Sequence, residues 1–228
     1  MSSLVETPGS KQTASGWQGV SADWSADKEA FTDVSWGKAM MWVFLLSDTF
    51  IFGCFLTSYM TVRMSTTVDW PLTSEVFALT VGGVHVPLLL IAIMTFILIT
   101  SSGTMAMAVN CGYRRDKAKA FWLITVTALL GASFVGMQAF EWSKLIMEGV
   151  RPWSNPMGAA QFGACFFMIT GFHGLHVSLG VIYLMVVAFK VKRGDYDDSN
   201  FEIVEIAGLY WHFVDLVWVF IFAFFYLW

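Results

Sequence analysis

The sequence predicts an all-α membrane protein with five transmembrane helices, and three observations support this fold class. Hydrophobic residues make up 57% of the 228-residue chain and charged residues only 13%, whereas about a quarter of an ordinary soluble domain is charged. Five apolar stretches are each long enough to cross a bilayer, which takes about 20 residues per helix. Basic residues cluster in alternate connections between these stretches, a pattern typical of polytopic membrane proteins.

The spans are expected at residues 38–62, 84–109, 119–146, 160–190 and 204–228. The first ends near Arg63. The second is expected to open at His85-Val-Pro87, because proline fits a first helical turn. The third runs to about Met147, where a segment rich in glycine and proline indicates a turn. The fourth ends at a basic segment around Lys190, and the fifth reaches the last residue. Together they form one transmembrane domain, residues 38–228.

The first 37 residues are polar and are expected to form a cytoplasmic tail. They contain no basic segment followed by an apolar run, so they do not read as a secretory signal. The net charge of −4 indicates no nucleic-acid partner. The three cysteines are scattered and show neither a disulfide framework nor zinc-binding spacing. They are expected to be buried free thiols that pack as small apolar groups: Cys54, Cys111 and Cys165.

The basic residues also predict an orientation. Ten of the 13 lie in the tail or in the second and fourth connections. The positive-inside rule places these segments in the cytoplasm, so the N-terminus is expected inside and the C-terminus outside. An odd number of spans gives the same opposition of termini.

Polar side chains inside the spans are the candidate functional residues. A charged group at the centre of a bilayer costs about 3 kcal/mol or more, so these groups are expected to face a protein interior. The set is Asp48, Gln138, Glu141, His173, His176, Glu205, His212 and Asp215.

Helical spacing indicates which of these side chains can meet. At about 100° per residue, Glu205, His212 and Asp215 fall within one arc of roughly 80°. His173 and His176 share a face of the fourth span. At a rise of about 1.5 Å per residue, His173, His176, His212 and Asp215 are expected at a depth similar to that of Asp48, near the middle of the membrane. We therefore expect one mid-membrane network of Asp48, the two histidines of the fourth span, His212 and Asp215, with Glu141 apart near the outer boundary.

Three kinds of chemistry are compatible with such a set. The His-x-x-His pair can bind a metal or supply a haem ligand. Chains of carboxylates and histidines can relay protons in a pump or transporter. Hydrogen bonds between helices can fix their register and rotation, at roughly 1 kcal/mol each. We favour interhelical hydrogen bonding. The sequence shows no pair of broken helices, which would indicate a transporter site, and no thiolate cluster.

At this point the motifs resemble subunit III of the haem–copper oxidases. The resemblance covers about residues 36–228 in order. In the fourth span it rests on Gly171-Phe-His173-Gly-Leu-His176, which follows Phe166-Phe167. In the fifth span it rests on Trp211-His212-Phe213-Val-Asp215-Leu-Val-Trp218, with Glu205 seven residues before His212. The third span adds Gly136-Met-Gln138-Ala-Phe-Glu141, and the first adds Phe44-Leu-Leu-Ser47-Asp48.

The resemblance implies a function without redox chemistry in this chain. Subunit III has no haem or copper of its own, since both lie in partner subunits. It sits beside subunit I, which reduces oxygen and pumps protons, and in a complex that also holds subunit II. The implied role is to stabilise subunit I and to support proton uptake and oxygen access. The implied location is the bacterial cytoplasmic membrane, with bound phospholipid.

Two features separate this chain from many family members. It resembles the short five-helix form, so the lipid-holding cleft of the seven-helix form cannot be carried over, and another subunit or lipid is expected to cover the exposed face. Asp48 is typical of the quinol-oxidase branch, whereas Phe172 resembles the cytochrome c branch, which leaves the electron donor open. Two alternative functions stay open as well: an accessory protein of a nitric oxide reductase system, and a free-standing haem b or proton-coupled carrier.

Overall fold

The computed structural model of the chain describes residues 34–81, 84–196 and 201–227. The tail expected over residues 1–37 lies almost wholly outside the described residues. Residues Gly37–Trp228 make up one compact unit. In its described part, five helices are long and apolar enough to cross a membrane, which confirms the predicted fold class.

The helix bounds agree with the predicted spans to within a few residues at most ends. Helix α2 covers Trp36–Ser65, α4 covers Leu89–Tyr113, α5 covers Lys117–Met147 and α6 covers Ala160–Arg193. Helix α7 covers Glu202–Phe222 and continues as a π-helical segment, η1, over Ala223–Leu227. A short helix, α3, covers Thr73–Val76.

The second span begins later than the sequence predicts. Residues Ala78–Val81 (β1) and Val84–Pro87 (β2) form an antiparallel hairpin with Val81 paired to Val84. Pro87 therefore ends a strand and does not open a helix. Leu88 then takes a left-handed backbone conformation with φ of 59°, and α4 starts at Leu89. The β-branched Val84 and Val86 before Pro87 favour extended backbone, and hydropathy alone does not distinguish this segment from a helix.

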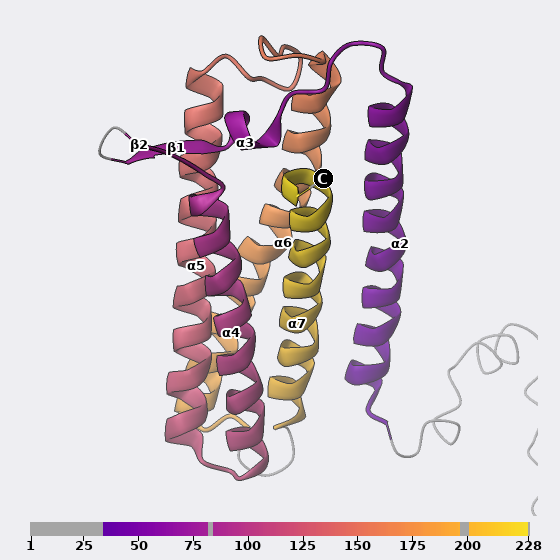
Figure 1. Cartoon of the computed structure of the whole chain (residues 1–228). Coiled ribbons are helices and arrows are strands. Elements are labelled where there is room, and N and C mark those ends of the chain that lie inside the picture. Colours follow the sequence, from indigo (N-terminus) through magenta and orange to yellow (C-terminus); the bar gives the residue numbers. More distant parts are fainter. Residues whose placement is uncertain (1–33, 82–83, 197–200, 228) are drawn as a thin grey trace, which may run out of the picture. The chain divides into compact units, whose positions relative to one another are not determined.

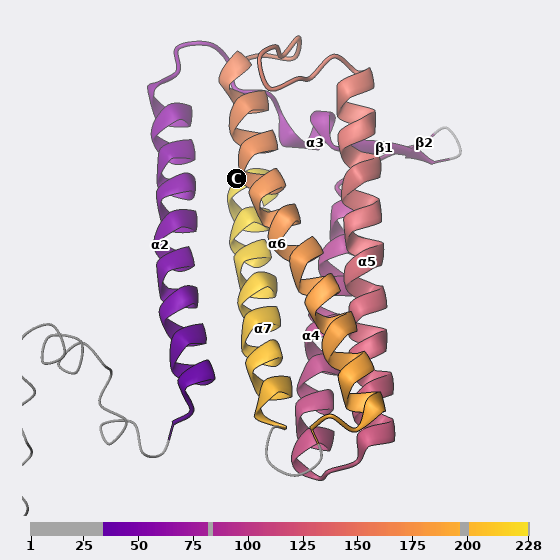
Figure 2. The ribbon, with the colours of Figure 1, turned by 180° about the vertical axis from the view of Figure 1, so that it is seen from behind.

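Four helices pack in a closed ring and α2 lies beside them. In the ring, α4 contacts α5, α5 contacts α6, α6 contacts α7 and α7 contacts α4. Both ribbon views show α2 next to α6 and α7 with its axis set away from the ring (Figure 1, Figure 2). Only 17% of the most apolar stretch of α2 is buried within the chain, against 39% in α6 and α7. Helix α2 is therefore the most peripheral of the five.

Two helix ends in the connections have recognisable capping residues. The side chain of Asp116 accepts a hydrogen bond of 3.2 Å from the backbone N–H of Lys119 and caps the start of α5. Hydrogen bonding by Lys119 holds the pKa of Asp116 below its usual value. Gly194 ends α6 in a left-handed conformation with φ of 86°, which glycine adopts without strain.

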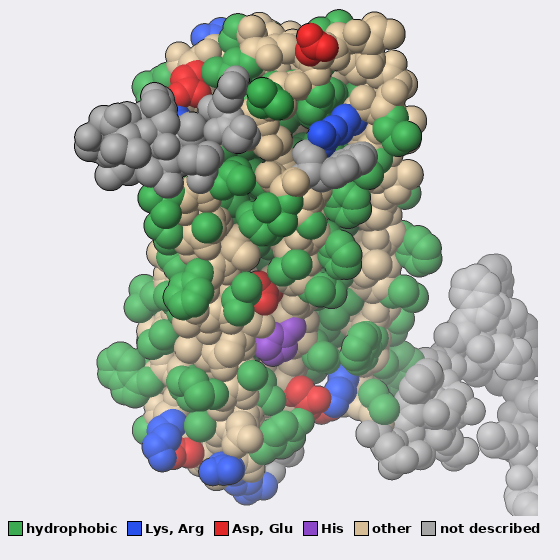
Figure 3. Space-filling view, viewed as in Figure 1, with side chains coloured by type: hydrophobic (Ala, Val, Ile, Leu, Met, Phe, Trp, Pro, Cys, Tyr) green, Lys and Arg blue, Asp and Glu red, His purple; other side chains and the backbone are tan. Residues whose placement is uncertain are grey.

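The outer surface of the helices carries large apolar side chains, which a soluble protein would bury. Large apolar side chains such as Phe50, Phe96 and Trp122 are 65–70% exposed, and hydrophobic side chains are spread along the length of the face drawn in Figure 3. Basic side chains gather at the end where the α4–α5 connection lies (Figure 3). Such a surface suits a bilayer, so the chain is a multi-pass membrane protein.

Candidate functional site

The polar side chains inside the spans bind one another in small groups between helices. Asp48 of α2 is 4% exposed and His176 of α6 is 9% exposed. Their Oδ2 and Nε2 atoms lie 2.9 Å apart, although the angles do not meet hydrogen-bond criteria for Oδ2. His176 Nδ1 lies 2.8 Å from the carbonyl oxygen of Phe172. Because a carbonyl only accepts, Nδ1 carries a proton and Nε2 is left to face Asp48.

His173, one turn before His176, has an apolar environment. It is fully buried, with its ring stacked on Trp218 at 5.3 Å between centroids and edge-on to Phe134 at 5.9 Å. Neither of its ring nitrogens has a hydrogen-bond partner among the described residues. The expectation that His173 joins a mid-membrane network is therefore not met: aromatic rings surround it.

A second polar group lies between α4 and α7. Ser102 Oγ lies 2.6 Å from His212 Nδ1, and Asp215 follows His212 by three residues on α7. Two indole hydrogen bonds flank this group: Trp211 Nε1 donates to Ser101 Oγ and Trp218 Nε1 donates to Thr95 Oγ1, both at 3.0 Å. The expected single network is thus divided into an α2–α6 pair and an α4–α7 group.

Glu205 lies at the end of the bundle formed by the start of α2 and the start of α7. Its carboxylate forms an ion pair with Lys38 of α2 and accepts a hydrogen bond of 2.5 Å from Tyr113 Oη of α4. One carboxylate thereby joins three helices. No sequence pattern indicated Lys38 or Tyr113 as its partners, because both lie at helix ends that are remote in the chain.

The opposite end carries Glu141 and Gln138, as their spacing on the third span indicated. Glu141 is 4% exposed and accepts a hydrogen bond of 3.3 Å from Tyr226 Oη in η1. Gln138 Nε2 donates to the backbone carbonyl of Thr170 in α6 at 2.8 Å. These contacts tie α5 to α6 and η1, and Glu141 stays apart from the mid-membrane groups, as predicted.

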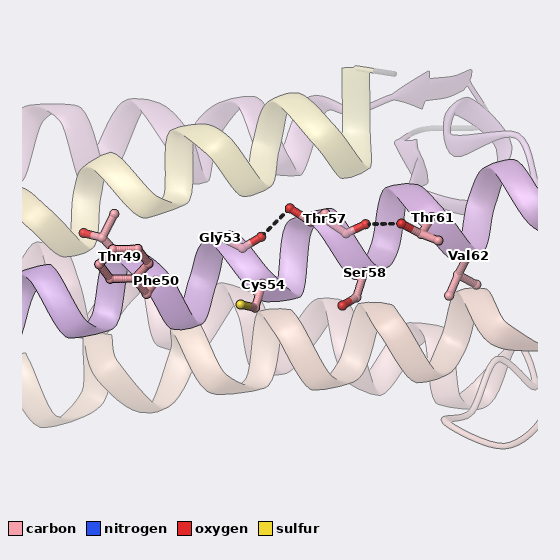
Figure 4. Close-up of a pocket in the computed structure, with 8 residues that line it drawn as sticks. All are labelled: Thr49, Phe50, Gly53, Cys54, Thr57, Ser58, Thr61 and Val62. Carbon is pink, nitrogen blue, oxygen red and sulfur yellow. Dashed lines mark hydrogen bonds between the residues drawn. The ribbon is translucent and has the colours of Figure 1, made fainter.

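The exposed face of α2 is a stripe of small side chains. A shallow pocket of about 630 Å³ lies along it (Figure 4). Thr57 Oγ1 donates to the carbonyl of Gly53 and Thr61 Oγ1 to that of Thr57, at 2.8 and 2.9 Å. The hydroxyls are thus satisfied within the helix. Cys54 also lies on this face and is exposed, so the expectation of a buried thiol is wrong there.

The described residues contain no group of three or more histidine, cysteine, aspartate or glutamate side chains arranged to hold a metal ion. Apart from His173 and Asp215, the polar side chains of the spans form contacts that each link two or three helices. Such contacts fix helix rotation and register within a bilayer.

Comparison with known proteins agrees with this architecture. A sequence model of the family described as "Cytochrome c oxidase subunit III" matches residues 20–228. A "Probable quinol oxidase subunit 3" from Staphylococcus aureus (strain USA300) is 35% identical over 188 residues, which cover 82% of this chain and 86% of the relative. A protein of the same description from Staphylococcus epidermidis is 34% identical over 189 residues, with the same coverage of each chain. The chain therefore belongs to the subunit III family of the haem–copper oxidases.

Proposed function

We propose that this chain is the non-redox subunit III of a proton-pumping terminal oxidase. In this role it stabilises the catalytic subunit I and supports proton uptake and oxygen access. The observation that carries the proposal is the pairing of the intramembrane polar groups with one another. Asp48 binds His176, and Glu205 binds Lys38 and Tyr113. Groups used in this way hold helices in position beside a partner.

We further propose quinol as the electron donor of the complex. Two observations favour it: the relatives from Staphylococcus are described as quinol oxidase subunits, and Asp48 stands in the first long helix, where that branch of the family often has aspartate. The complex is proposed to lie in a bacterial cytoplasmic membrane, with subunits I and II and phospholipid as neighbours of this chain. Haem and copper are assigned to those partner subunits.

Deletion of this chain in its source bacterium tests the proposal. Membranes from the deletion strain are expected to keep the haem absorption of the oxidase, because the redox centres lie elsewhere. The purified oxidase should lose its quinol-dependent oxygen uptake sooner during turnover than the wild-type complex, since a supporting subunit is missing. Restoring the gene on a plasmid is the control.

A spectrum of the isolated chain separates this proposal from a free-standing haem carrier. The purified chain is expected to show no Soret band. A band corresponding to one haem per chain would contradict the proposal, and so would a deletion strain whose quinol oxidase is as durable as that of the wild type.

A further inference from the structure

Ser102, His212 and Asp215 form a polar group on the outer surface of the bundle, at the level of the membrane interior. All three side chains are only half-buried in this chain. A histidine and an acidic side chain are visible at mid-height on the α4–α7 face, surrounded by hydrophobic side chains (Figure 3). His212 lies about 15 Å along the helix axis from Glu202, the first residue of α7. Ionisable groups therefore reach the outer surface of the bundle near the middle of the membrane.

The hydrogen bonds of this group are incomplete within the chain. Ser102 Oγ lies 2.6 Å from His212 Nδ1, and His212 Nε2 has no hydrogen-bond partner among the described residues. A carboxylate accepts several hydrogen bonds, yet Asp215 accepts none from the described residues: its Oδ1 is enclosed within this chain, which leaves Oδ2 as the oxygen that can reach a neighbour. Acyl chains contain no donors, and an unsatisfied polar group in hydrocarbon is costly. A protein neighbour with a hydrogen-bond donor at this depth would remove the cost.

The adjacent part of α4 has room for a neighbouring helix. Gly103 and Ala106 lie within one helical turn of Ser102, and both are exposed. A Cβ atom built on Gly103 would meet no other atom within 4 Å. Small residues beside a polar one are the usual composition of close contacts between transmembrane helices.

We propose that the α4–α7 face, defined by Ser102, Gly103, Ala106, His212 and Asp215, seats a transmembrane helix of a neighbouring oxidase subunit. That helix presents a hydrogen-bond donor to the carboxyl group of Asp215 at mid-membrane. The inference rests on the proposed function, because it identifies the face through which this chain joins its complex.

Two other faces of the bundle have space for a neighbouring helix but carry fewer polar groups that a partner could bind. The α2 stripe around Gly53 is open, yet its threonine hydroxyls bond to carbonyls of the same helix. A groove of about 290 Å³ between α5 and α6 contains Gln138, whose amide nitrogen already bonds to Thr170. Neither face carries an ionisable group that a partner must cover, so the α4–α7 face is the stronger candidate.

Three open glycines provide a matched test. Gly53, Gly103 and Gly136 lie on α2, α4 and α5, and a Cβ atom at each would meet nothing within 4 Å. Leucine at any of them should leave the fold of this chain intact and raises helix propensity. Each of Gly53→Leu, Gly103→Leu and Gly136→Leu is expressed with an affinity tag in place of the native chain. The oxidase is then purified in mild detergent, and the haem recovered per tagged chain is measured.

Gly103→Leu is expected to lower the haem recovered by about tenfold or more, because an added side chain overfills a close helix contact. Gly136→Leu should recover as much haem as the wild type. Asp215→Leu is expected to lower recovery as well, since the donor of the partner loses its acceptor. Thermal unfolding of each tagged chain confirms that the variants are folded.

Several outcomes would overturn the inference. Full recovery with Gly103→Leu would show that no helix covers this face, and loss with Gly53→Leu alone would assign the contact to α2. Two differently tagged copies that co-purify through this face without haem would assign it to self-association. Failure of the proposed function has another signature: the wild-type chain itself would recover no haem protein.

Discussion

Asp48 and His176 face each other as a buried pair between α2 and α6, and this contact determines how the chain responds to substitution of Asp48. The Nδ1 proton of His176 is committed to the carbonyl of Phe172. A proton between Nε2 and Asp48 Oδ2 would lie either on the ring, which gives an ion pair, or on the carboxyl group, which gives a neutral pair. In both states the pair has no net charge, which suits its burial inside a membrane.

Substitution of Asp48 distinguishes the two states. In the neutral state, Asp48→Asn keeps a donor facing His176 Nε2, so the complex should assemble as in the wild type. Asp48→Leu leaves the ring nitrogen without a partner and should cost about 1–3 kcal/mol. The midpoint of thermal unfolding of the purified complex measures both effects. Phe50→Leu is the matched control, since Phe50 is on the same helix and 70% exposed. If Asp48→Asn were as damaging as Asp48→Leu, the ion pair would be the native state.

At the residue scale, the sequence indicated the polar groups but few of their partners. Asp48, His176 and Glu141 could be identified because charge in an apolar span is rare. Ser102, Tyr113 and Tyr226 could not, because hydroxyl groups are common in membrane helices and their role depends on which helices adjoin. Counting depth along each helix placed His173 at the right level but could not show that Trp218 and Phe134 occupy its surroundings.

At the scale of elements, Gly131 of α5 leaves space for side chains of two other helices of the ring. A Cβ atom there would lie 2.3 Å from Cη2 of Trp211 in α7 and 2.8 Å from a methyl group of Val181 in α6. Trp211 is also fixed by its hydrogen bond to Ser101 of α4. The indole thus fills the centre of the four-helix ring, and only glycine leaves space for it.

This contact predicts opposite effects of one substitution at two positions of α5. Gly131→Ala forces the indole or the helix to move and should destabilise the chain by about 1–3 kcal/mol. Gly136→Ala meets no atom within 4 Å and should be neutral or slightly stabilising, because alanine is the better helix former. Unfolding of the two variants by titration with denaturing detergent, followed by helical circular dichroism, measures the difference. Equal stabilities would contradict the packing described here.

The elements themselves could mostly be predicted, and the exception has a physical reason. Long apolar runs have few alternatives to a helix in a membrane, so the five helices follow from hydropathy. The hairpin before α4 does not, because Val84 and Val86 are both apolar and β-branched and so suit a helix in a membrane as well as a strand. Its pairing with Ala78–Val81 depends on backbone contacts that periodicity cannot reveal.

At the scale of the whole molecule, the basic residues agree with the alternation of helix directions. The α4–α5 connection, the end of α6 and the start of α2 lie at one end of the bundle (Figure 1). These segments carry Arg114, Arg115, Lys190, Lys192, Arg193 and Lys38. The positive-inside rule assigns that end to the cytoplasm, and the interface proposed on α4 and α7 does not depend on this assignment.

Labelling of single cysteines tests the predicted orientation. Arg114 and Trp153 are both exposed and lie at opposite ends of the bundle, in the α4–α5 and α5–α6 connections. After the three native cysteines are replaced by serine, Arg114→Cys and Trp153→Cys are treated in intact cells with a thiol reagent that cannot cross the membrane. Trp153→Cys is expected to react at once, because the rule places its connection outside. Arg114→Cys should react only after the membrane is permeabilised, which also serves as the control that both thiols are accessible. The reverse pattern would invert the orientation while leaving every helix contact unchanged, because the packing of the bundle is independent of the side from which it is inserted.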